Sequence, residues 1–275
     1  KSPHENGGQG RVPLNANREK DGIVHHFTLA FLSLQKHLTT QHPDLPIADS
    51  RFHILVGPKN WNRLPATIRQ RFGKRVRGGD SVTYQGIVRA MQMNWAGRVF
   101  AQAARLIGAP LPYDLSSVGR PAVVIVTEDI AGDGQFWVRQ YGRQSGFPQV
   151  VHSSKRFAGP TGLEEYIGYG IGMALKVEAS ETALLFKSDH YFLSILGRRV
   201  RLPKHLSPGA LVVGHHDLAD GKFRFSLSLK SKLFRQLIHQ DAIFEDSKKC
   251  LTVTSQQSGC STANASYATR ASTIR

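Results

Sequence analysis

Residues 222–230 read Lys-Phe-Arg-Phe-Ser-Leu-Ser-Leu-Lys, with an apolar side chain at every second position. This alternation is typical of a β-strand that packs one face on a core and exposes the other face to water. The Asp220-Gly221 pair just before this stretch favours a tight hairpin turn, because such turns need residues that tolerate positive φ. We therefore predict a strand over 222–230, preceded across the turn by a strand over 210–217.

The chain repeats this pattern of short strands and turns over most of its length. Further strands are predicted over Ser81–Ala90, Ala122–Thr127, Gln135–Tyr141, Val150–Phe157, Tyr166–Glu178, Ala183–His190 and Phe192–Val200. An antiparallel sheet this wide usually curls. The fold class is therefore α+β: a wide, curled antiparallel sheet of about eight or nine strands, half-barrel or barrel-like, packed with two or three helices.

Apolar residues spaced three and four apart predict two helices inside this domain. The helix over 64–72 begins near Pro65 and places Leu64, Ile68 and Phe72 on one side, so Arg63, Arg69 and Arg71 are expected to face outward. The helix over 95–107 ends at a Gly and Pro stop signal. Its predicted inward face comprises Trp95, Val99, Phe100, Ala103, Leu106 and Ile107.

We divide the 275 residues into four segments. Residues 1–22 and the Ser/Thr-rich tail 247–275 lack the apolar content to offset ordering entropy, and we expect both to be disordered. Residues 23–50 are predicted to be a helix, with an apolar stripe over 24–38, followed by a linker. Residues 51–246 are predicted to form a single α+β domain. The apolar stripe over 24–38 also allows an interpretation in which the chain is an interaction module that docks a neighbouring domain.

The formal net charge is +16, and the excess is concentrated: residues 51–120 contain twelve Lys or Arg but only Asp80 and Asp114. Such a segment attracts anions, and an anionic membrane surface is one partner that it would bind. Nucleic acid is disfavoured, because no zinc-finger spacing, aromatic RNA-binding motif or dense basic helix is present. The apolar run over 27–34 is too short to span a bilayer. We expect a cytoplasmic protein, with membrane contact limited to its periphery.

The chain also resembles a bacterial family, the domain-of-unknown-function family 4166, over residues 52–246. The resemblance rests on segments whose order and spacing agree with that family. They are Leu64-Pro65-Ala66-Thr67-Ile68-Arg69, Trp137-Val138-Arg139-Gln140-Tyr141-Gly142, Leu163-Glu164-Glu165, Gly168-Tyr169-Gly170-Ile171-Gly172-Met173, Arg201-Leu202-Pro203-Lys204-His205-Leu206-Ser207-Pro208-Gly209 and Gln240-Asp241-Ala242-Ile243-Phe244. Residues 230–235 depart from the family pattern of a His-Pro-Leu run followed by Gly.

The resemblance implies a fold and an association, not a reaction. The family has no established activity, and its domain is often fused behind a saccharopine-dehydrogenase-like reductase. A separate reductase is therefore an expected partner. No Gly-x-Gly-x-x-Gly motif follows a strand in this chain, so we expect no dinucleotide or other cofactor to bind it. Cys250 and Cys260 both lie in the tail, away from any His, and no nucleophile elbow occurs; we lean away from an enzyme.

Large apolar side chains occur on elements that could face the inside of a curled sheet. They are Trp95, Phe100, Trp137, Tyr166, Tyr169, Met173, Phe192, Phe223 and Phe225. A curled sheet either fills its interior with such side chains or encloses an apolar cavity. In the second case the ligand is an apolar or amphipathic small molecule, such as a lipid or an isoprenoid-like compound. This is the function we favour.

Two alternatives involve polar residues. His215 and Asp217 share a face of the predicted strand, and with His190 they could form the metal site of a small metal-dependent enzyme, such as a hydrolase. Otherwise they are hairpin-end residues bonded to the turn. The other candidates for a third ligand are His205 and Glu164. Glu164 or Glu165, but not both, could line a cavity as a general acid or base, because neighbours on a strand face opposite ways.

Overall fold

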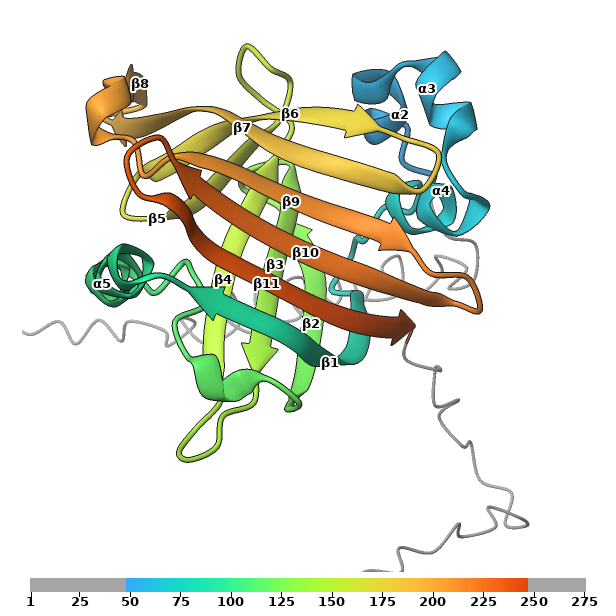
Figure 1. Cartoon of the computed structure of the whole chain (residues 1–275). Coiled ribbons are helices and arrows are strands. Elements are labelled where there is room, and N and C mark those ends of the chain that lie inside the picture. The colour runs from blue at the N-terminus through green and yellow to red at the C-terminus, as the bar shows by residue number, and fades with distance from the viewer. Residues whose placement is uncertain (1–47, 247–275) are drawn as a thin grey trace, which may run out of the picture. The chain divides into compact units, whose positions relative to one another are not determined.

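The computed structural model describes residues 48–246, and about half of them belong to one antiparallel sheet. Its strands are β1 (Ser81–Met93), β2 (Pro121–Asp129), β3 (Gly134–Tyr141), β4 (Gln149–Arg156), β5 (Glu164–Gly168), β6 (Ile171–Ala179), β7 (Ala183–Ile195), β8 (Arg198–Arg201), β9 (Ala210–Asp217), β10 (Lys222–Ser231) and β11 (Arg235–Asp246). The strand order is β6-β5-β4-β3-β2-β1-β11-β10-β9-β7-β8, and β6 also pairs with β7. Ten strands thus close into a barrel (Figure 1). The short strand β8 lies outside this ring and pairs with the end of β7.

The predicted fold class, an α+β domain with a curled, barrel-like antiparallel sheet, is confirmed. The sequence prediction missed two strand boundaries. The predicted strand over 166–178 is two strands, β5 and β6, because the chain reverses at Tyr169 and Gly170, which have φ of 51° and 73°. The predicted break between the strands over 183–190 and 192–200 was wrong: β7 runs through it, and a second reversal, at Leu196 and Gly197 with φ of 48° and 76°, separates β7 from β8.

The predicted hairpin of strands 210–217 and 222–230 is present. Strand β10 pairs with β9 in antiparallel register, and the turn contains Asp220 and Gly221 at φ of 50° and 73°. All four alternating apolar side chains of β10, Phe223, Phe225, Leu227 and Leu229, are buried inside the barrel. Strand β11, which was not predicted, pairs with β10 and β1 and completes the ring.

Three short helices lie together at one end of the barrel: α2 (Arg51–Val56), α3 (Pro58–Arg63) and α4 (Ala66–Phe72) (Figure 1). Their apolar side chains fill that end, where the Phe52 ring lies 6.0 Å from Phe186 and the Phe72 ring lies 5.0 Å from His215. The predicted inward face of the 64–72 helix is confirmed. The prediction that Arg71 faces outward was wrong: its guanidinium lies 3.9 Å above the Phe223 ring.

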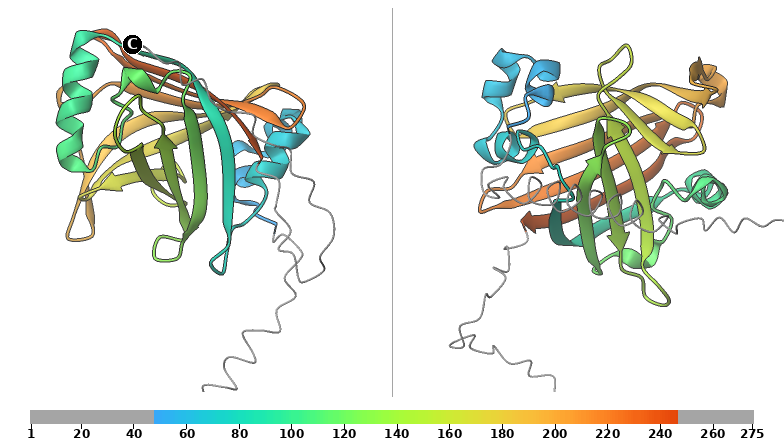
Figure 2. Two further views of the ribbon diagram at one scale, coloured as in Figure 1. Left: turned by 90° about the horizontal axis from the view of Figure 1, so that it is seen from below. Right: turned by 180° about the vertical axis from the view of Figure 1, so that it is seen from behind.

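The other helical segment consists of α5 (Trp95–Ala103) and η1 (Ala104–Ile107), and Figure 2 shows it alongside the sheet at the end away from α2–α4. Its predicted inward face was wrong for three of the six side chains. Trp95, Val99 and Leu106 are exposed, whereas the small residues Ala96, Gly97, Ala101 and Ala104 are buried. The reason is close contact with β11: a Cβ on Gly97 would lie 2.0 Å from the Leu237 carbonyl oxygen.

The remaining predictions for the termini lie outside the described residues. These are the disordered segments 1–22 and 247–275, the helix over 23–38 and nearly all of the linker that follows it. Within residues 48–246, no helix combines the length and apolar content needed to cross a membrane.

Replacing Gly97 by Ala tests the close packing of α5. At an exposed helix position this change stabilises a protein by up to about 1 kcal/mol. Here we expect the free energy of unfolding to fall by about 1–3 kcal/mol, because the added methyl group collides with backbone. Urea unfolding of Gly97→Ala, with exposed Arg98→Ala on the same helix as the control, measures the difference. A stabilised Gly97→Ala variant would contradict the described contact.

Candidate ligand-binding cavity

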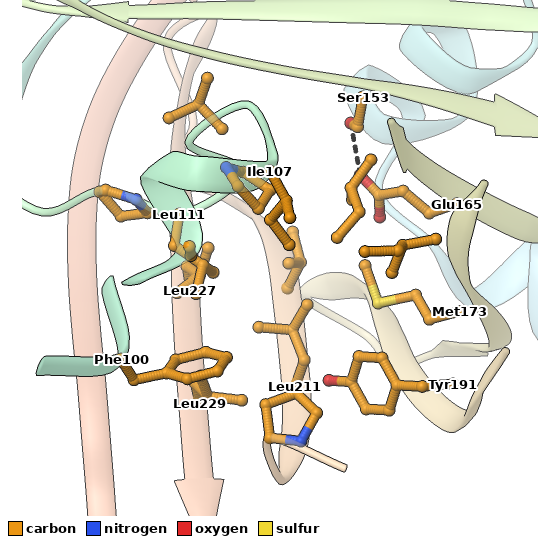
Figure 3. Close-up of a pocket in the computed structure, with 18 of the residues that line it drawn as sticks. Phe100, Ile107, Leu111, Ser153, Glu165, Met173, Tyr191, Leu211, Leu227 and Leu229 are labelled. Atoms are coloured by element: carbon orange, nitrogen blue, oxygen red, sulfur yellow. Dashed lines mark hydrogen bonds between the residues drawn. The ribbon is translucent and has the colours of Figure 1, made fainter. Parts of the chain in front are cut away.

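A cavity of about 320 Å³ opens inside the barrel next to α5 and η1, at the end away from α2–α4. Apolar side chains from the helical segment and from the strands line it. Phe100 and Ile107 come from the helical segment, and Leu211, Leu227 and Leu229 come from β9 and β10. Figure 3 shows these side chains on one side of the space, with Met173, Tyr191 and Glu165 on the other. Inward-facing side chains alternate along each strand, so the wall is continuous.

The inner part of the cavity carries a buried charged cluster from β3, β4 and β5. Oxygen Oε1 of Glu165 lies 2.8 Å from Lys155 Nζ and 3.5 Å from an Arg139 guanidinium nitrogen. The Ser153 hydroxyl donates a 2.6 Å hydrogen bond to the same oxygen and accepts a 3.2 Å hydrogen bond from Arg139. All four side chains are nearly inaccessible to water. We call these four residues the floor cluster.

The floor cluster keeps Glu165 ionised. Burial alone would raise the pKa of this carboxyl, but the neighbouring Lys155 and Arg139 charges and the Ser153 hydroxyl outweigh burial and lower the pKa to about 2. A carboxylate with this pKa holds no proton near neutral pH. The prediction that Glu164 or Glu165 acts as a general acid or base is therefore not supported for Glu165. The prediction that only one of the two lines the cavity is confirmed.

Glu164 points to the outer face of the sheet. Its carboxylate accepts hydrogen bonds from Arg199 Nε at 2.9 Å and from the Tyr166 hydroxyl at 3.0 Å. The ring of Tyr166 also packs on Phe192, with centroids 5.4 Å apart. This group stabilises the outer surface of β5 and has no part in the cavity.

The end of the barrel next to α4 is filled. His215 projects from β9 among the rings of Phe72, Trp137 and Phe223, which lie 5.0–5.8 Å from it. Burial, with a further contribution from the Arg71 charge, lowers the pKa of His215 well below its ordinary value, so the ring is neutral. No room for a ligand remains between these rings.

The structure does not assemble the predicted metal site. His215 lies inside the barrel, Asp217 accepts a 2.7 Å hydrogen bond from the Thr67 hydroxyl of α4, and His190 pairs with Asp189. His205 is exposed in η3 (Lys204–Leu206). Throughout residues 48–246, no three His, Cys, Asp or Glu side chains are grouped so that they could hold a metal ion.

The predicted ligand-lining residues separate into four groups. Phe100, Phe225 and Met173 line the cavity. Trp137 and Phe223 belong to the filled end, and Tyr166 and Phe192 pack together on the outer face. Trp95 and Tyr169 are 70% and 75% exposed and lie outside the cavity, because α5 turns its small residues inward and Tyr169 sits in the β5–β6 turn.

Sequence reasoning missed Arg139, Ser153, Lys155 and Tyr191. The signal for Arg139 was present: it lies between Trp137 and Tyr141 at a spacing of two on one strand, so all three side chains share the inner face. An Arg side chain is nevertheless expected at the surface, and the burial of Arg139 follows from its ionic contact with Glu165 across the sheet.

Fold and site together define an antiparallel β-barrel with an apolar cavity and a charged floor. Residues 64–244 match the family model described as "Domain of unknown function (DUF4166)", so the chain belongs to this family. A search of curated proteins found no match. Among solved structures, a "putative thioesterase II" from Thermobifida fusca YX aligns at 10% identity, covering 66% of this chain and 84% of that chain, with a TM-score of 0.21. A similarity this weak carries no argument about fold or function.

Replacing Glu165 by Gln tests the floor cluster. The change leaves Arg139 and Lys155 buried without a carboxylate, so we expect the free energy of unfolding at pH 7 to fall by about 3–5 kcal/mol. The control is Glu164→Gln on the same strand, where Arg199 is 43% exposed and the loss should be smaller. Equal losses in the two variants would contradict this account.

Comparing the pH dependence of unfolding in the wild type and in Glu165→Gln tests the lowered pKa of Glu165. The folded-state pKa of Glu165, about 2, lies below its ordinary value of 4.5. Its stabilising contribution is therefore fully present above about pH 4.5 and is lost as the pH falls through about 2. Between these limits the free energy of unfolding should fall more steeply in the wild type than in Glu165→Gln. Parallel curves would contradict the lowered pKa.

Proposed function

We propose that this domain binds an apolar or amphipathic small molecule, such as a lipid or an isoprenoid-like compound, in the cavity and does not catalyse its conversion. The observation that carries the proposal is the cavity of about 320 Å³ with an apolar wall, open beside α5 in an otherwise filled barrel. Its volume is at the lower end of the range for small-molecule sites, about 300–1,000 Å³.

The chemistry of the lining supports binding without catalysis. The described lining residues include no His or Cys, and the one hydroxyl close to a carboxylate, Ser153, donates its hydrogen to Glu165. A serine nucleophile needs a base that can accept its proton. Because Glu165 has a pKa of about 2, it is too weak a base for this role at neutral pH.

We also propose that the cavity end of the barrel contacts an anionic membrane. Two segments, residues 95–107 and 195–206, contribute side chains to the cavity wall, and a third, residues 232–235, contacts the first through the rings of Phe234 and Trp95. Together they contain eight Lys or Arg and no Asp or Glu, and of the eight Arg199 is paired with Glu164 of β5. Exposed apolar side chains lie among these charges, including Trp95, Leu106, Leu196 and Leu206. This combination suits an interface between lipid headgroups and acyl chains, from which an apolar ligand could enter.

We place this proposed membrane contact at the cavity end rather than at the α2–α4 end. At that end many of the basic side chains of residues 51–120 have acidic partners: Arg51 and Arg75 both bond to Asp133, and Arg63 bonds to Glu181. The positive field there is correspondingly weaker. The reductase partner and the cytoplasmic location stay predictions.

Filling the cavity tests ligand binding. Val151 and Val150 are neighbours on β4, but Val151 lines the cavity whereas Val150 is 45% exposed on the outer face. We expect Val151→Phe to weaken binding of the neutral fluorescent probe N-phenyl-1-naphthylamine by about tenfold or more, since the new ring occupies the space. Val150→Phe should bind the probe like the wild type. Equal binding in all three proteins would place the probe elsewhere and contradict the proposal.

Flotation with vesicles of phosphatidylglycerol and phosphatidylcholine tests the membrane contact. Each basic residue near such a surface contributes about 1 kcal/mol, so the double variant Arg198→Gln/Arg201→Gln should bind roughly 30-fold more weakly. The control is Lys59→Gln/Arg63→Gln on α3, which should bind like the wild type. The reverse ranking would return the contact to the α2–α4 end.

A further inference from the structure

We infer that the ligand of this cavity is a single-chain carboxylic acid whose carboxylate is bound by Arg139, with its apolar chain directed towards α5. This inference rests on the proposed function and specifies the ligand class. It starts from the charge balance of the floor cluster, where two cations, Arg139 and Lys155, face one carboxylate, Glu165.

The distances to Glu165 show which of the two cations is less closely paired with the carboxylate. Glu165 Oε1 lies 2.8 Å from Lys155 Nζ but 3.5 Å from the nearest Arg139 nitrogen, so Lys155 is its principal partner. The other hydrogen bond of the Arg139 guanidinium goes to the neutral Ser153 hydroxyl. Within the described part of the chain, Arg139 Nε donates no hydrogen bond, and Lys155 Nζ contacts Glu165 as an ion pair only. The positive charge of Arg139 is therefore poorly compensated.

Arg139 is also the cation that a ligand can reach. Arg139 lines the cavity, whereas Lys155 lies behind Glu165 and does not. The Arg139 side chain is only 7% exposed, so water compensates its charge poorly. Glu165 is the only acidic residue among the described lining residues. A buried, partly unpaired guanidinium is costly, and an anion that enters the cavity would relieve that cost.

The shape of the site selects a carboxylate with one chain. Guanidinium donors match a carboxylate in a two-point geometry that a hydroxyl or an ester cannot reproduce. Apart from Tyr141 and Tyr191, the rest of the wall is apolar and includes Val213, Leu227, Phe100 and Ile107. Tyr191 adds a neutral hydroxyl, because burial raises its pKa to about 12. One polar group at the inner end of an apolar space favours a linear amphipathic acid.

Matched ligands test the inference in the wild-type protein. Isothermal titration calorimetry at pH 7.5 compares dodecanoic acid with its methyl ester and with 1-dodecanol, which share the chain but lack the charge. We expect the acid to bind about tenfold to a hundredfold more tightly, the range for a hydrogen-bonded ionic contact. In Arg139→Gln this preference should disappear while the ester binds as before. Arg63→Gln, on exposed α3, should keep the preference.

The outcomes separate this inference from the proposed function. If acid, ester and alcohol bind equally, or if Arg139→Gln keeps the preference, the carboxylate assignment is wrong although the cavity binds apolar ligands. If none of them binds, and N-phenyl-1-naphthylamine does not bind either, the proposed function fails together with the inference. Arg139→Lys guards against a folding defect in Arg139→Gln: it keeps the charge without the two-point geometry, and should retain only part of the preference.

Discussion

The pairing of β6 with β7 is the constraint on which the rest of the structure depends. Without it, the chain would be an open sheet with two free edges. The hydrogen bonds from Ile171–Ala179 to Leu184–Leu193 join those edges, and the inner face becomes an enclosed space. Side chains that would cover one face of an open sheet then face one another across a barrel. Whether the space is filled depends on their sizes.

The interior is filled at one end of the barrel and hollow at the other. Near α4, the large rings of Phe72, Trp137 and Phe223 meet around His215 and leave no space. Near α5, the barrel wall carries Leu and Val, and the helical segment turns small residues towards β11, so a cavity remains. The floor cluster lies between the two regions. Its ionised side chains lie at the inner end of an otherwise apolar space. A ligand's polar group would therefore bind there.

The sequence predicted the features that depend on local pattern and missed those that depend on tertiary contact. The alternation in β10 and the Asp220-Gly221 turn were sufficient for a hairpin and, with the other strands, for a curled sheet. Strand β11 was missed because its inner face includes Gln240 among Ile238, Ala242 and Phe244, which weakens the apolar alternation.

The site illustrates the same limit. The inward face of α5 could not be predicted from hydrophobicity, because Gly97 packs against the Leu237 backbone and pushes Trp95 and Val99 outward. The floor cluster joins β3, β4 and β5 across the sheet, and period-two spacing shows only that Arg139 shares a face with Trp137. That Arg139 faces Glu165 follows from the strand registers, which no single segment encodes.

A crystal structure of the full chain with 12-bromododecanoic acid would test the central claim most directly. The account predicts a carboxylate within hydrogen-bonding distance of Arg139 and an anomalous bromine peak near Phe100 and Leu229. A bromine peak only on the outer surface, with the cavity filled by rearranged side chains, would contradict the claim that the barrel is a binding site.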